Sequence, residues 1–251
     1  GSAGASEKRN VAWRGARAPL IAFTDDDCRP QRQWLERILV AAAKRPGAII
    51  QGLTEPDPDE AAVLRGAPWA RTQFVEPPTA WAETCNIVYP RALLERLGGL
   101  DGRLSMGEDT DLAARALATG AELVAAPALL VYHGVDDPWL FARIRAAARW
   151  RDLAWVVKRH PQLRRALWGR IWFMPEHAAL AGAAAGVALG RRHRAALALS
   201  APWLALSLRH RGYGPRGIVR AVSELPGRAA IDAAELAVLA RASLTYRTLL
   251  L

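Results

Sequence analysis

The stretch "IAFTDDDCRP", residues 21–30, decides the fold, because an apolar run leads directly into three consecutive aspartates. Short apolar runs bounded by proline and acidic residues are typical of buried strands, and residues 18–24 have this form. In an open α/β sheet, ligands bind beyond the carboxyl ends of the strands. Asp25, Asp26 and Asp27 therefore stand where such a sheet presents its binding residues.

A bound divalent cation would explain why three like charges are placed side by side. Asp25 and Asp27 flank one residue, so on an extended chain their side chains point the same way, with Asp26 on the opposite side. Mg²⁺ and Mn²⁺ take hard oxygen ligands, and Mg²⁺ in particular is held by one or two carboxylates plus substrate phosphates. The alternative is a solvated turn that caps the next helix, since many loops contain such acids by chance.

Strands and helices alternate outward from this stretch, which predicts an α/β layer fold. Proline and glycine at 46–47, the glycine pair 98–99 and Gly120 mark helix ends. The two cysteines read as free thiols, with Cys28 a small buried filler. The predicted helices are 6–18 with Ser6 as N-cap, 32–45, 91–97 and one beginning in "GEDTDL"; the predicted strands are 18–24, 48–54, one at Cys85 and one or two within 121–133.

A second acid group opens the predicted helix in "GEDTDLAARALATG", where Glu108, Asp109 and Asp111 crowd its first turn. Acids at this place suit the positive end of the helix dipole, so capping is sufficient to explain them. Capping does not exclude chemistry, because a carboxylate held by a rigid element is well placed to act as a base.

Charge divides the chain into residues 1–135 and a basic, helical region, residues 136–251. Residues 1–134 hold 15 Lys+Arg and 17 Asp+Glu, whereas residues 135–251 hold 19 and 7. A helix over 137–160 interleaves tryptophans with arginines, and two apolar segments, 171–190 and 195–208, flank "RRHR". We expect a helical hairpin at a membrane interface, with a soluble packed helix pair as the alternative, because neither segment is a clean membrane span.

A sequence pI of about 10.6 is also compatible with a nucleic-acid-binding protein. The basic residues interleave with long apolar segments and no recognised nucleic-acid motif is present, so we expect no nucleic-acid partner.

Four segments taken in order resemble the family 2 glycosyltransferases, over roughly residues 5–135. They are "EKRNVAWRGA", "IAFTDDDCRPQRQWL", "CNIVYPRALLERLGGLDGRLSMGEDTDLAARALATG" and "VYHG". The resemblance implies a GT-A, Rossmann-like mixed sheet and an inverting, metal-dependent reaction. It also implies a nucleotide-diphospho-sugar donor and Mn²⁺ or Mg²⁺ as cofactor. By analogy we expect a cell-surface glycan or lipid-linked acceptor and a location on the cytoplasmic face of the cell membrane.

The resemblance also assigns roles at the metal and the base. Asp27 matches the direct metal ligand, Asp25 lies nearer the donor's ribose or the metal, and His133 completes the metal site in some members. Asp109 matches the catalytic base, with Glu108 beside it.

Further positions are implied for donor and acceptor. Arg9 and Asn10 match a segment near the donor nucleotide, and Asn86 falls in the stretch that faces both sugars. Arg115 sits where the family often has a helix-borne arginine, and Trp81 is our candidate for a sugar-stacking platform.

Family members carry a strand–helix–strand portion before the segment that Arg9 and Asn10 match, and this chain begins almost at that segment. We therefore expect an N-terminally truncated domain. The alternative function is a non-catalytic relative that acts as a membrane-bound binding module.

Overall fold

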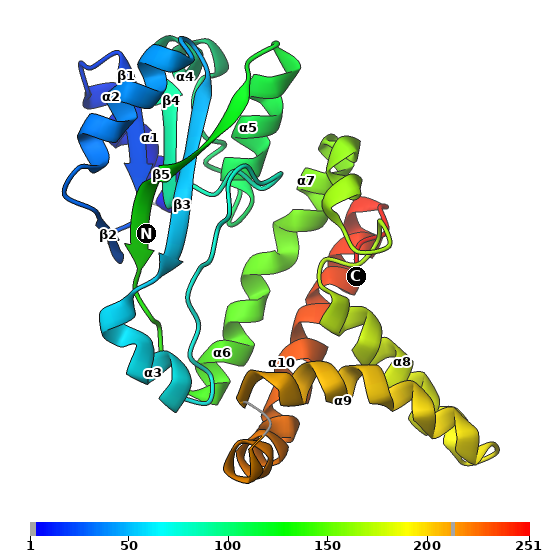
Figure 1. Ribbon diagram of the computed structural model, residues 1–251. Coiled ribbons are helices and arrows are strands. Elements are labelled where there is room, and N and C mark those ends of the chain that lie inside the picture. Colours follow the sequence, from blue (N-terminus) through cyan, green and yellow to red (C-terminus); the bar gives the residue numbers. More distant parts are fainter. Residues whose placement is uncertain (1–3, 212–213) are drawn as a thin grey trace. The chain divides into compact units, whose positions relative to one another are not determined.

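The computed structural model describes residues 4–211 and 214–251, and the chain forms two compact units, Gly1–Asp137 and Pro138–Leu251. The first unit is a mixed sheet covered by helices, and the second is helical (Figure 1). The predicted α/β fold with a helical C-terminal region is confirmed.

Five strands form one sheet in the order β1-β4-β3-β5-β2. β4 pairs antiparallel with β1 and β3, β3 pairs parallel with β5, and β2 pairs antiparallel with β5. The carboxyl ends of β1, β3 and β5 therefore lie along one edge, where an α/β sheet binds ligands. The strands are β1 (Leu20–Thr24), β2 (Cys28–Pro30), β3 (Ile49–Pro56), β4 (Asn86–Pro90) and β5 (Leu123–His133).

Alternation along the strands builds a core on each face of the sheet. Ile49, Ile87 and Tyr89 face helices α1 (Ala5–Gly15), α4 (Arg91–Leu97) and α5 (Glu108–Ala118). Their neighbours Ile50 and Val88 face α2 (Trp34–Lys44). Adjacent strand residues thus serve opposite cores, as the two-residue period of a strand requires. A short η1 (Pro58–Glu60) and α3 (Ala61–Gly66) follow β3 (Figure 1).

The N-terminal helix differs from its prediction. Its N-cap is Gly4, whereas Ser6 is buried within the helix, so the expected capping by Ser6 is wrong. The helix ends at Gly15, because Ala16 has extended backbone angles. The segment 121–133 forms one strand, and Gly120 has a φ of +86° just past the end of α5.

A bulge interrupts the pairing of β3 with β5, and Asn86 repairs it. Register jumps from Gly52↔Ala126 to Leu53↔Leu130, next to Pro127, which has no N–H for the ladder. The Asn86 amide donates to the carbonyl oxygens of Leu53, at 2.8 Å, and Leu129, at 2.7 Å. These two bonds compensate for the interrupted ladder, since an unpaired buried carbonyl costs about 1–3 kcal/mol.

The second unit consists of short helices around one long one. The helix expected over 137–160 is interrupted by 3-10 turns, and the expected hairpin is formed by α8, η4 and α9. No helix in the described ranges is both long and apolar enough to cross a membrane. The elements are α6 (Leu140–Ala146), η2 (Ala147–Asp152), α7 (Leu153–Arg159), η3 (Pro161–Ala166), α8 (Pro175–Gly190), η4 (Arg194–Ser200), α9 (Ala201–Leu208), η5 (Arg209–Arg211) and α10 (Pro215–Tyr246).

A side chain at Gly52 would clash with its neighbours at the bulge. A Cβ at this position would lie 2.3 Å from Asn86 Nδ2 and 2.4 Å from the backbone oxygen of Leu129. We expect Gly52→Ala to lower the free energy of unfolding by about 1–3 kcal/mol, measured by urea titration. Gly15→Ala is the matched control, since nothing lies within 4 Å of its added Cβ. Equal stability of the two variants would contradict this account of the bulge.

Candidate functional site

Arg9 of α1 joins the two acid groups that are far apart in the sequence. Its guanidinium donates to Asp25, directly after β1, and to Glu108 Oε1, at the first position of α5, at 2.9 Å. The three side chains are 12–21% exposed, so the pairs are partly shielded from water. Arg9 was predicted near the donor nucleotide; in this structure its side chain is held by carboxylates.

The electrostatics of this cluster favour the charged form of Arg9. Burial alone would lower the pKa of the guanidinium, but the hydrogen bond and charge of Asp25, together with Glu108, outweigh burial and raise the pKa. The cluster therefore holds a permanent positive charge between two segments of acids.

Asp109, the second residue of α5, has a raised carboxyl pKa. Burial is the largest cause and the negative charge of Glu108 the next, and they raise the pKa to about 7. Oδ1 accepts the backbone N–H of Thr110 at 2.8 Å. In the described part of the chain Oδ2 has no hydrogen-bond partner, so one oxygen is fixed and the other is available for a proton.

The three aspartates do not continue the strand as the sequence reading assumed. β1 ends at Thr24, residues 25–27 turn, and the N–H of Cys28 donates to the carbonyl of Asp25 at 3.2 Å. Asp25 therefore meets Arg9, whereas Asp27 approaches His133. The expectation that Asp25 and Asp27 point the same way is wrong, because a turn does not keep the two-residue period of a strand.

Asp27, Cys28 and His133 form a group of metal-ligating side chains. One ligand atom from each lies within 4.8 Å of the others, and His133 Nε2 is 3.7 Å from Asp27 Oδ2. The antiparallel register of β2 and β5 pairs Cys28 with His133, which explains the approach. Cys28, which we expected to be a buried filler, is half-buried in this group, and burial raises the pKa of its thiol to about 11.

The orientation of the His133 ring is compatible with metal binding through Nε2. Its Nδ1 lies 2.8 Å from the carbonyl oxygen of Gly134, and a proton on Nδ1 makes this a hydrogen bond. The lone pair of Nε2 then faces the Asp27 carboxylate, which is 54% exposed. The donors present therefore fit a divalent cation, with Asp27 and His133 as ligands and Asp25 outside the group.

Two asparagines predicted to face the donor or the sugars serve the scaffold instead. The Asn10 side chain is buried and bonds both the N–H and the carbonyl of Leu100, while Trp13 donates to it. Asn86 is 1% exposed, and its amide oxygen accepts from Trp34. The side-chain groups of both residues are satisfied inside the core, and their roles at the donor and the sugars stay predictions.

Arg115 is also a structural residue. Its guanidinium donates to Asp111 at 2.7 Å and to the carbonyl oxygens of Leu97 and Gly99 at 2.9 and 2.7 Å. Asp111 is fully buried, so the pair fixes α5 to the end of α4. The prediction that Arg115 contacts a sugar is therefore not supported by the position of its side chain.

The segment before β4 lies against the start of α5. The carbonyl of Trp81 accepts from the Thr110 hydroxyl at 2.8 Å, so Trp81 borders the Asp109 end of the site; its stacking role stays a prediction. Glu83 adds negative charge that also raises the Asp109 pKa. No signal in the sequence pointed to Glu83, because its proximity to Asp109 arises only in the fold.

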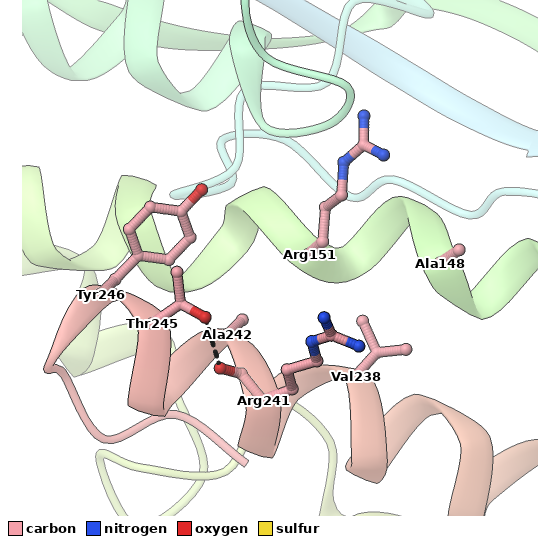
Figure 2. Close-up of a pocket in the computed structure, with 7 residues that line it drawn as sticks. All are labelled: Ala148, Arg151, Val238, Arg241, Ala242, Thr245 and Tyr246. Carbon is pink, nitrogen blue, oxygen red and sulfur yellow. Dashed lines mark hydrogen bonds between the residues drawn. The ribbon is translucent and has the colours of Figure 1, made fainter.

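Three cavities of the described chain lie apart from the predicted residues. One, of about 340 Å³, lies between η2 and α10 (Figure 2). A second, of about 740 Å³, lies along α8 and α9, and a third adjoins β2. The residues of the first are Ala148, Arg151, Val238, Arg241, Ala242, Thr245 and Tyr246.

Comparison with known sequences finds distant relatives. No protein-family model matches the chain. The pre-mycofactocin glycosyltransferases of Mycobacterium tuberculosis strains CDC 1551 / Oshkosh and ATCC 25618 / H37Rv are each 28% identical over 142 residues. This match covers 53% of the chain and 30% of the relative, so the chain spans less than a third of the length of these proteins.

Comparison with solved structures finds glycosyltransferases of low sequence identity. The mannosyltransferase PcManGT from Pyrobaculum calidifontis, in complex with GDP-Man and Mn²⁺, has 21% identity and a TM-score of 0.48, over 98% of this chain and 67% of its own. S. aureus TarS 1–349 in complex with UDP-GlcNAc has 13% identity and a TM-score of 0.43, over 98% and 73%.

Proposed function

We propose that this chain is part of a family 2 glycosyltransferase that moves a sugar from a nucleotide-diphospho-sugar to an acceptor hydroxyl with inversion. The observation that carries the proposal is Asp109, a carboxylate with a pKa of about 7 at the binding edge of the sheet. The four sequence motifs and the relatives named as glycosyltransferases support the same class.

Asp109 would act as the general base. The acceptor oxygen forms its bond to the anomeric carbon while the bond from that carbon to the diphosphate oxygen breaks on the opposite face. The leaving diphosphate keeps the electron pair, and the hydroxyl proton passes to Asp109. A base whose pKa lies near the working pH is both ionised and basic enough for this transfer.

Arg9 would hold the acids in place for this reaction. It pairs with Glu108, whose negative charge raises the pKa of Asp109. It also anchors Asp25, from which the turn to Asp27 begins. Arg9 is thus a positioning residue in our proposal.

Asp27 and His133 would hold a divalent cation, with Cys28 at its margin. When bound, the cation neutralises the negative charge that develops on the diphosphate. An imidazole donor suits Mn²⁺ better than Mg²⁺, whose ligands are oxygens, so we propose Mn²⁺.

We expect Asp109→Asn to lose about 10²–10⁴-fold in turnover, because the amide cannot accept the proton. The measurement is steady-state transfer to an acceptor with a panel of nucleotide sugars. Asp26→Asn is the matched control, since the Asp26 carboxylate, between Asp25 and Asp27, is exposed and should be replaceable. If the wild type binds the donor in calorimetry but transfers no sugar, the alternative of a non-catalytic relative is favoured. Full turnover by Asp109→Asn would refute the assignment of Asp109 as the base.

The pH dependence follows from the same pKa. Below about pH 7 the base is protonated, so kcat/KM should fall about tenfold per pH unit. The unfolded chain releases this proton near its ordinary pKa of 3.8, so folding stability contributed by Asp109 declines as pH rises towards 7. Unfolding titrations of Asp109→Asn should lack that decline. An unchanged profile in the variant would contradict the assignment.

Metal removal tests the other end of the site. Chelation should abolish transfer, and His133→Ala should weaken Mn²⁺ binding by at least about tenfold. Calorimetric Mn²⁺ titration gives a readout that does not depend on turnover. Asp27→Asn should behave like His133→Ala, whereas Asp26→Asn should bind as the wild type does. Equal affinities in all four proteins would place the cation elsewhere.

A further inference from the structure

The outer half of the α8–η4 hairpin exposes large apolar side chains. Val187 and Leu189 at the end of α8 are 62% and 50% exposed, and Leu197 and Leu199 of η4 are 49% and 48% exposed. Four such residues within thirteen positions form a patch rather than scattered exposures, and patches of this kind mark interaction surfaces.

Close packing within the hairpin leaves these side chains only partly covered. Gly182, Gly186 and Gly190 recur every fourth residue along α8, and η4 packs on this face of the helix. A Cβ at Gly186 would lie 2.6 Å from the carbonyl oxygen of Ala196. The face with small residues is thus used inside the hairpin, as in helix pairs that pack in lipid. Leu197 and Leu199 pack beside Gly190 and Gly186, yet about half of each residue stays exposed.

Polar groups gather on the inner side of the hairpin, towards α10. His177 of α8 is 1% exposed, and its Nε2 lies 3.4 Å from Oε2 of Glu235, itself 3% exposed. Trp203 of α9 donates to Asp232 at 2.9 Å. Apolar residues outside and ionisable residues inside reverse the usual pattern of a water-exposed helix.

The turn of the hairpin carries a cluster of positive charge. Arg191, Arg192 and Arg194 are exposed, and none has a carboxylate within salt-bridge distance in residues 4–211 and 214–251. A tip of this kind cannot enter hydrocarbon end-on, but arginines that extend along a headgroup layer beside apolar neighbours are favourable.

We propose that the α8–η4–α9 hairpin lies in the surface of an anionic lipid bilayer. The apolar patch would enter the boundary of the acyl chains, and the arginine turn would contact the lipid phosphates. The cavity of about 740 Å³ along α8 and α9 is lined mainly by apolar residues and by Arg191, which suits an acyl chain with an anionic head. The lipid contact does not depend on the glycosyl transfer proposed above.

Vesicle flotation of the purified chain tests this proposal. The wild type should float with vesicles of phosphatidylcholine and phosphatidylglycerol, and less with phosphatidylcholine alone or in high salt. Val187→Asp/Leu197→Asp should reduce binding at least about tenfold, because two charges replace inserted apolar groups. Arg191→Gln/Arg192→Gln/Arg194→Gln should reduce binding to anionic vesicles about a hundredfold.

The matched control is Leu35→Asp/Leu39→Asp on α2, two residues that are 67% and 64% exposed in the first unit. It should float as the wild type does, and thermal unfolding should show all variants folded. The proposal would be overturned if the wild type floated with none of the vesicles, or if the control variant lost vesicle binding to the same extent as the hairpin variants. It would also be overturned if the chain bound duplex DNA through the three arginines and did not bind vesicles.

Discussion

Neutralisation of crowded carboxylates is the constraint on which the first unit depends. The turn after β1 and the first turn of α5 bring acids to one edge of the sheet, and without a counterion they would repel one another. Arg9 supplies the counterion to Asp25 and Glu108. Removing one partner of such a partly buried pair leaves an uncompensated charge, so α1, β1 and α5 are mutually dependent.

The polar residues around this cluster work as a frame. Asn10, one residue from Arg9, fixes the loop at Leu100, and Arg115 binds the carbonyl of Gly99 in the same loop. Gly99 has a φ of +79°, and a Cβ there would lie 2.4 Å from Asn10 Oδ1. The frame sets where α5 begins, and hence where Asp109 stands. If Asp109 is the base that we propose, a position fixed in this way means that it needs little reorganisation when it reacts.

Local patterns predicted the elements, but not the side-chain partners. Apolar runs and glycine stops located β1, β3, α4 and α5 because these signals act over a few residues. The strand order, the turn at 25–27 and the pairing of Arg9 with Glu108, 99 residues away, depend on long-range packing. For the same reason Asn10, Asn86 and Arg115 looked like ligand contacts: a polar side chain in a motif reads alike whether it meets a ligand or a buried carbonyl.

The two ends of the candidate site have different structural origins, joined through Arg9 and the turn. Asp27, Cys28 and His133 are placed by the β2–β5 ladder, whereas Asp109 is placed by α5. A change in the ladder should therefore alter the proposed cation site without moving Asp109, the proposed base. The Arg9–Asp25 pair links both ends, since Asp25 begins the turn to Asp27 and Arg9 holds Glu108. Loss of this ion pair should therefore disturb both ends of the proposed site, whereas loss of one ligand should disturb only its own end.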